Sequence, residues 1–146
     1  VSIKLCYVSF HPLASQDSNK CLIRLARSLR SPSICNRIPE QNGRDRCLAH
    51  VNVKMKNLSL CGKIQTKSIR ESCISQYAAS KEKVELCYDL EIEKRNMCII
   101  NIAYLTRNSV LCNELNLDRF ITDCNEFFAN RSQQSRSMLW GLIRLN

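Results

Sequence analysis

Ten cysteines recur along this 146-residue chain at regular spacing, and no other feature constrains the fold as strongly. After a first separation of 15 residues, successive cysteines alternate between steps of 14 residues and steps of 11 or 12. One step of each kind makes a period of 25 or 26 residues, which is typical of stacked supersecondary units. The cysteines are Cys6, Cys21, Cys35, Cys47, Cys61, Cys73, Cys87, Cys98, Cys112 and Cys124.

Apolar and small residues follow the same spacing at helical offsets. One set of cysteines is followed four and five residues later by an apolar and a small residue, as at Tyr77 and Ala78. The other set is flanked by Ile or Leu, as at Leu60 and Ile64. Spacings of three and four residues indicate helices. With only three glycines and three prolines, the chain lacks the turn residues of an all-β fold.

Capping residues predict where the helices begin. Ser31, Asn57 and Asn108 stand four residues before cysteines of the second set, and Asn42 and Ser68 stand five residues before cysteines of the first. Each unit is then a helix of about eight residues, a turn and a helix of about twelve. The predicted fold is all-α: a short α-solenoid of about five disulfide-stapled α-hairpins, each of 25–26 residues.

The whole chain, residues 1–146, is expected to form one repeat domain. The repeats cover roughly residues 18–129. Segments 1–17 and 130–146 are expected to act as caps or docking ends, because both contain apolar residues and solenoids need their ends covered.

The cysteine spacing also indicates a cellular compartment. Zinc modules and redox sites need close pairs such as C-x-x-C, and the sequence has none. Disulfides are therefore expected, and with them an oxidising, extracellular or cell-surface location. No run of about 18 apolar residues is present, so the sequence predicts no membrane span.

Two pairing schemes are compatible with hairpin geometry, because each places the turn midway between the paired cysteines. Pairing across the 14-residue steps leaves Cys6 and Cys124 unpaired. Pairing across the first step and the 11- or 12-residue steps uses all ten cysteines, so the even number of cysteines favours this second scheme. A third scheme would link equivalent cysteines of stacked helices, and it is disfavoured because helix axes about 8–10 Å apart are hard to join by a disulfide. The favoured pairs are Cys6–Cys21, Cys35–Cys47, Cys61–Cys73, Cys87–Cys98 and Cys112–Cys124.

The repeat pattern is C-[LI]-x-x-[LVIY]-A-x7-[IL]-C-x-x-[IL]-x5-R-x-x-C, as read from Cys73 through Arg95 to Cys98. It resembles the cysteine-containing α-hairpin repeats of exported prokaryotic proteins, chiefly archaeal ones. The resemblance covers roughly residues 18–129 and implies a helical repeat fold and an exported location rather than an activity. Asn52 in place of the alanine and Ile121 in place of the arginine depart from the pattern.

No catalytic, metal or cofactor site is predicted, and the chain is expected not to be an enzyme. His11 and His50 have no metal-ligand spacing. Carboxylates crowd residues 82–93 among lysines, which favours a solvated helical face.

Two further patterns concern single residues. Arg44, Arg70 and Arg95 each precede a cysteine by three residues, and a structural role is favoured over anion binding. Asn57 and Asn130 begin Asn-x-Ser sequons and are candidate glycosylation sites, although Asn57 is also a predicted cap.

Charge is distributed unevenly along the chain. Residues 1–70 contain 13 Lys and Arg against 3 Asp and Glu, and residues 71–146 contain 9 against 10. The leading hypothesis is a non-enzymatic extracellular structural or interaction protein that self-assembles into a filament or surface layer. The alternative is a monomeric secreted module that binds an acidic partner or polyanion. The predicted basic contact face comprises Arg24, Arg27, Arg30, Arg37, Arg44 and Arg46.

Overall fold

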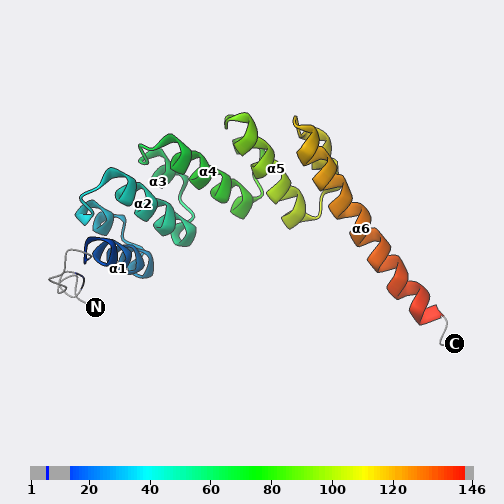
Figure 1. The fold of residues 1–146 in the computed structure, drawn as a ribbon, viewed down its shortest axis with the longest axis horizontal. Coiled ribbons are helices and arrows are strands. Elements are labelled where there is room, and N and C mark those ends of the chain that lie inside the picture. The colour runs from blue at the N-terminus through cyan, green and yellow to red at the C-terminus, as the bar shows by residue number, and fades with distance from the viewer. Residues whose placement is uncertain (1–5, 7–13, 144–146) are drawn as a thin grey trace.

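The computed structural model describes the backbone of Cys6 and residues 14–143, and the side chains of Cys6 and residues 18–130. Within these residues all regular structure is helical, and long helices lie side by side in chain order to form an arch (Figure 1). A short helix precedes each long helix after the first. The long helices are α1 (Ala14–Leu29), α2 (Gln41–Met55), α4 (Lys67–Lys81), α5 (Ile92–Thr106) and α6 (Asp118–Ile143), and the short ones are η2 (Pro32–Arg37), α3 (Leu58–Gly62), η3 (Val84–Cys87) and η4 (Ser109–Glu114).

One disulfide staples each unit, as the repeat pattern predicts. The four complete hairpins are closed between the short and the long helix, and a fifth bridge ties Cys6 to α1. The paired Cα atoms lie 5.5–5.7 Å apart, within ordinary disulfide reach. The bridges join Cys6 to Cys21, Cys35 to Cys47, Cys61 to Cys73, Cys87 to Cys98 and Cys112 to Cys124.

The helix lengths differ from the sequence-based expectation. The short helices have 4–6 residues rather than about eight, and three of the four are 3₁₀ helices. The central long helices α2, α4 and α5 each have 15 residues rather than about twelve. A helix of one or two turns is unstable alone in water, so each short helix depends on its disulfide and on packing.

The core runs between the row of short helices and the row of long ones. Leu60, Ile64 and their equivalents around the other short-helix cysteines are buried, as the spacing predicts, except that Leu86 is only half-buried. Ala26, Ala78 and Ala103 are fully buried, because a small residue lets neighbouring helices approach closely. The cysteines of the four complete hairpins are likewise inaccessible to solvent.

Asn52 occupies the alanine position in α2 and is buried through specific hydrogen bonds. Its Nδ2 lies 3.3 Å from the sulfurs of both Cys61 and Cys73, the bridge of the next hairpin. Its Oδ1 accepts a bond from the amide of Asn57. The departure from the repeat pattern is therefore a polar contact between adjacent units.

The predicted caps are correct for the short helices. Asn57 and Asn108 cap their helices by accepting backbone amides two residues on, from Ser59 and Val110. Ser31 stands at the cap position of η2 without a capping side-chain bond.

Asn42 and Ser68 are not caps, because α2 and α4 begin earlier and have Glu40 and Thr66 as their N-caps. The amides of Gln65 and Thr66 and the Thr66 hydroxyl instead bond to Asp45, a fully buried residue of the preceding long helix.

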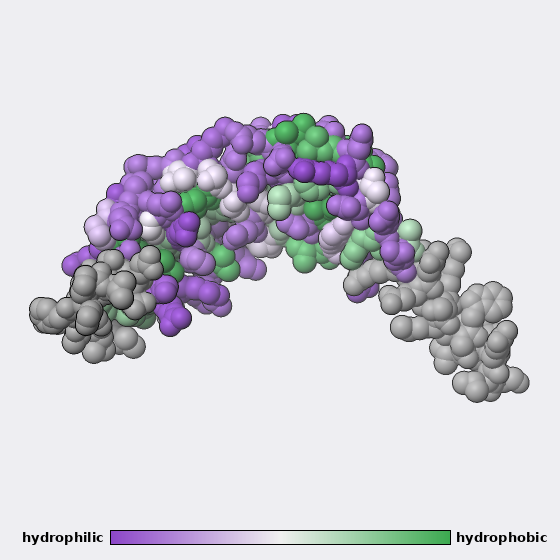
Figure 2. All heavy atoms as spheres, in the orientation of Figure 1, coloured by the Kyte–Doolittle hydropathy of each residue, from purple (hydrophilic) through white to green (hydrophobic). Residues whose placement is uncertain are grey.

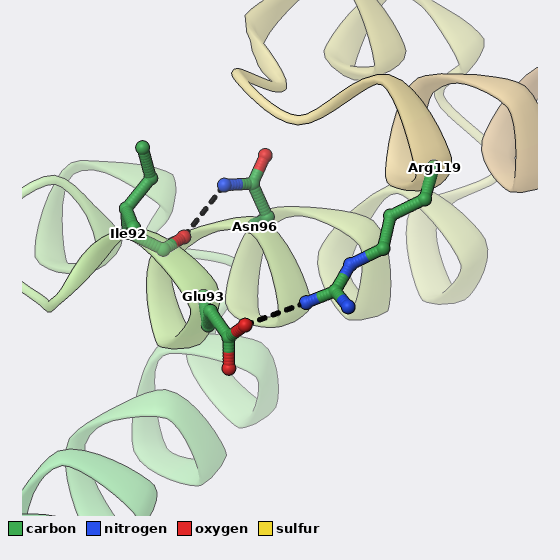
Figure 3. A network of polar contacts seen from close by, with 4 residues as sticks. All are labelled: Ile92, Glu93, Asn96 and Arg119. Carbon is green, nitrogen blue, oxygen red and sulfur yellow. Dashed lines mark hydrogen bonds and ion pairs between the residues drawn. The ribbon is translucent and has the colours of Figure 1, made fainter.

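A similar hydrogen bond between a buried polar side chain and the loop of the next unit is present at α5. Asn96 is fully buried and donates to the carbonyl of Ile92 (Figure 3). Its Oδ1 accepts the amide of Asn116, just before α6, at 2.7 Å. Asp45 and Asn96 both stand two residues before a long-helix cysteine. A buried polar side chain at this position therefore holds the loop that leads into the next long helix.

α6 changes the expected division of the chain. The helix continues from Asp118 to Ile143, so the predicted boundary at residue 130 falls inside a continuous helix. Figure 1 shows its C-terminal half projecting beyond the rest of the described arch. Residues 1–5, 7–13 and 144–146 of the predicted end segments lie outside the described residues.

Each long helix that precedes a short one ends in a residue with left-handed backbone conformation. Arg30, Lys56, Glu82 and Arg107 have φ between 50° and 57°. After α1, α4 and α5 the next amide bonds to the carbonyl five residues back, as in a Schellman turn. Glycine is the usual residue at such a position, because a Cβ atom is strained there.

Replacing Glu82 by glycine should therefore stabilise the fold. Relative to the matched variant Glu82→Ala, which removes the same charge but keeps a Cβ atom, Glu82→Gly should raise the free energy of unfolding by about 1 kcal/mol. Urea denaturation followed by circular dichroism measures the difference. Equal stability of the two variants would contradict the assignment of a strained turn.

Candidate binding face of the arch

A groove of about 510 Å³ crosses the C-terminal halves of three adjacent long helices. α4 packs between α2 and α5, and the groove lies over α4. The long helices run from the outer side of the arch to its hollow side, so their C-terminal ends face the hollow (Figure 1). The groove therefore lies over the halves of these helices that are nearer the hollow side.

The groove has a floor that includes small residues and walls with large apolar ones. Ser75 and Ala79, one helical turn apart on α4, line the floor with Ser80 and the longer side chains of Gln76 and Tyr77. Val53 of α2 forms one wall, and Tyr104 and Leu105 of α5 form the other. Leu105 is 67 % exposed and Val53 is 44 % exposed, so the groove presents apolar surface from two helices to solvent. Figure 2 shows hydrophobic surface on the hollow side of the arch amid mostly hydrophilic residues.

An aromatic cluster supports the α5 wall. The ring of Tyr104 stacks on that of Phe127 with centroids 4.0 Å apart, and Phe128 meets both rings edge to face. The Tyr104 hydroxyl lies 3.3 Å from the carbonyl of Asp123. Burial, with a smaller effect from Asp123, raises the pKa of Tyr104, so this wall is uncharged at physiological pH. The wall is a packed apolar edge rather than a set of free rings.

Exposed basic residues lie at the hollow ends of four successive long helices, three of which line the groove. Cationic side chains are favoured there because they complement the negative end of the helix dipole. In the hollow-side segments 27–33, 53–59, 79–85 and 104–110 the acidic residues are Glu82 and Glu85. The basic residues of these segments, called the basic rim below, are Arg27, Arg30, Lys54, Lys56, Lys81, Lys83 and Arg107, all of them exposed.

The predicted basic contact face is divided by the fold. Arg24 and Arg27 lie on α1, and Arg30 follows it on the hollow side. Arg46 is exposed on α2, beside a shallow surface pocket that reaches α1. Arg37 ends η2 at the opposite, outer end of its hairpin.

Arg44, the remaining member of the predicted face, is committed to the fold. Its Nη1 donates to the carbonyls of Ile38, at 2.9 Å, and Pro39. In the next unit the Nη1 of Arg70 likewise donates to the carbonyl of Ile64, at 3.0 Å. The recurrent arginine thus holds the turn between the short and the long helix, the structural role that the sequence favours. Arg95 lies inside the Cys87–Cys98 hairpin, whose disulfide loop is one residue shorter, and its buried Nε has no hydrogen-bond partner among the described residues.

The carboxylates of the stretch 82–93 partly serve the contacts between units. Glu91 pairs with Lys67 one unit earlier, and Glu93 accepts from Arg119 of α6 at 2.7 Å (Figure 3). These pairs are exposed and therefore stabilise the fold only slightly. Among the described residues, no group of three His, Cys, Asp or Glu side chains is placed to hold a metal ion.

The remaining predicted residues are at the surface or outside the description. His50 is exposed on α2, and His11 lies outside the described residues. Asn57 and Asn130 are both exposed. The capping atom of Asn57 is Oδ1, whereas a glycan attaches to Nδ2, so capping and glycosylation are compatible there. Glycosylation at both asparagines stays a prediction.

Comparison with known proteins finds no matching family, no matching curated protein and no matching solved structure. The chain is a cysteine-rich, all-helical protein with five disulfides. So many bridges indicate an oxidising environment. None of the described helices is both long enough and apolar enough to cross a membrane.

Proposed function

We propose that this chain is a non-enzymatic, extracellular or cell-surface interaction protein that binds an acidic partner over its hollow face. The observation that carries the proposal is the row of basic residues at the helix ends, the basic rim, beside an exposed apolar groove that Lys56 joins to it. Clustered charge of one sign steers partners of the opposite sign, and exposed apolar surface adds affinity once they meet. The disulfides hold the helices that carry this face, which reduces the entropy lost on binding.

Charge reversal on the rim tests the proposal. Lys54→Glu with Lys81→Glu changes two exposed residues in the last turns of α2 and α4. The matched control, Arg37→Glu with Lys63→Glu, makes the same change of charge at the outer ends of two short helices. Binding to heparin, used as a model polyanion, should weaken about tenfold in the rim variant over a salt series and much less in the control.

Equal weakening of the two variants would show that net charge alone governs binding. Absence of heparin binding by the unaltered protein at low salt would remove the basic rim as a polyanion-binding surface.

Self-assembly into a filament or surface layer is a second proposal, and the projection of α6 beyond the arch favours it. The segment 130–146 contains Leu139, Trp140 and Leu142, which could bind another copy. Electron microscopy of the purified protein should then show polymers, and monodisperse particles at all salt and protein concentrations would refute this proposal.

A further inference from the structure

We infer that the groove over α4 receives one amphipathic α-helix of a partner protein, with an apolar stripe facing the groove and acidic residues facing the rim. The inference rests on the proposed binding role of the hollow face and assigns the chemical class of its partner. It follows from the shape of the groove, the chemistry of its walls and the sign of the surrounding charge.

The shape fits a helix. Adjacent packed helices lie about 8–10 Å apart, so α2 and α5, on either side of α4, are separated by roughly twice that distance. A helix with its side chains is about 10–12 Å wide. Ser75, Ala79 and Ser80 are small, so a docked helix can approach α4 closely at these three positions, beside the longer side chains of Gln76 and Tyr77.

The walls select an apolar stripe. Val53 and Leu105 stand on opposite sides of the floor and are largely exposed, so a partner side chain inserted between them removes apolar surface from water on both sides. Residues at i, i+3, i+4 and i+7 of a helix provide such a stripe, as in other helix-in-groove complexes.

Nucleic acid fits this surface less well. Bases stack on exposed aromatic rings, and Tyr104 is already stacked on Phe127. A leucine wall offers a nucleic acid neither stacking nor hydrogen bonds.

The charge argues for an acidic partner and against a second copy of this chain. Lys56 lines the groove itself, and Lys54 and Lys81 stand in the last turns of α2 and α4, two of the helices that line it. The chain carries a formal net charge of +9, and its apolar C-terminal segment contains Arg131, Arg136 and Arg144. Docking that segment on the basic rim would bring like charges together.

Synthetic peptides test the inference on the full, oxidised protein. The probe is a fluorescein-labelled 18-residue peptide with Leu at i, i+3, i+4 and i+7 spacing and Glu on the other face, and its Kd is measured by anisotropy. A scrambled peptide of the same composition and a version with Lys in place of Glu are the matched ligands. The probe should bind at least about tenfold more tightly than either.

Three protein variants locate the site. Leu105→Ser removes a wall, and Ser80→Trp fills the groove from an exposed position. Ile92→Ser is the control, because Ile92 is 49 % exposed on the same helix but lies outside the groove. The two groove variants should each weaken probe binding about tenfold and leave heparin binding unchanged, whereas the control should alter neither.

The outcomes separate this inference from the proposed function. Equal binding of the scrambled peptide, or no effect of the groove variants, would overturn the helix inference while heparin binding still supported the basic rim. Equal binding of the Lys peptide would overturn the charge argument. A dimer that Leu105→Ser converts to monomer would make a second copy the occupant and also overturn the inference.

Discussion

Reduction of the five disulfides is expected to unfold the chain at room temperature. Each bridge closes a loop of 11–15 residues and contributes about 3 kcal/mol in the chain-entropy account. The total is comparable to, or larger than, the usual net stability of a domain, about 5–15 kcal/mol. The short helices have only 4–6 residues, so they do not persist without their bridges.

Far-UV circular dichroism with and without dithiothreitol measures this effect, and the oxidised protein in the same buffer is the control. One hairpin can be tested alone by replacing Cys61 and Cys73 with alanine, which should lower the free energy of unfolding by about 3 kcal/mol. Retention of the full helical signal after complete reduction would show that helix stacking suffices and that the bridges are dispensable.

Asp45→Ala is expected to have the largest effect of any single substitution away from the cysteines, about 3 kcal/mol or more. Its carboxylate accepts bonds from the Gln65 amide, the Thr66 amide and the Thr66 hydroxyl, and it also accepts from Gln41. Removal of the carboxylate leaves these donors unsatisfied where α4 begins. Asp45→Asn keeps the size and one acceptor oxygen, so it should destabilise the fold less.

Urea denaturation at neutral pH measures the free energies of unfolding of the three proteins. The unaltered protein should be the most stable and Asp45→Ala the least stable. A variant at an exposed position of the same helix, His50→Ala, should change stability by less than about 0.5 kcal/mol. Wild-type stability of Asp45→Ala would show that the start of α4 does not depend on the preceding unit.

The same carboxylate makes stability depend on acidity. Burial raises the pKa of Asp45, but the hydrogen bonds from Thr66, Gln65 and Gln41 outweigh this effect and lower the pKa below its ordinary value of 3.8. A carboxyl group whose pKa is lower in the folded state contributes its full stability above the ordinary pKa. That contribution is lost as the pH falls through the lower, folded-state pKa. Asp45→Asn should therefore remove part of the acid sensitivity that the unaltered protein shows below about pH 4.

Several features of the fold are local enough to be read from the sequence. The cysteine spacing and the apolar residues beside the cysteines predict stapled helical hairpins, because helical offsets and disulfide reach are short-range properties. The caps at Asn57 and Asn108 act within two residues, so they too are predictable. Arg44 and Arg70 recur because each holds a turn in its own unit.

The incorrect predictions concern contacts between units. Asn42 and Ser68 resemble N-caps when each is considered in its local sequence. In the fold, however, Asp45 accepts the amides of Gln65 and Thr66, about twenty residues away, so α4 begins before Ser68. Polar residues at this position recur in the sequence as Asp45, Glu71 and Asn96, which is the signal that would have revealed the link.

The position of the predicted basic contact face also depends on the arrangement of the helices, which the sequence does not show. Its residues are close in the sequence, but Arg30 and Arg37 lie at opposite ends of a unit because η2 runs from the hollow end to the outer end between them.

The sequence by itself determined the repeat unit, because helix periodicity, capping and cross-link spacing act over fewer than about thirty residues. It also indicated an oxidising location and a net positive charge. Only the tertiary structure decided where the candidate binding face lies. Val53, Ala79 and Leu105 come from three successive units, and they line one groove because stacking places the same turn of each long helix side by side. The basic rim depends on the same stacking, since it collects residues from the ends of four helices that are distant in sequence.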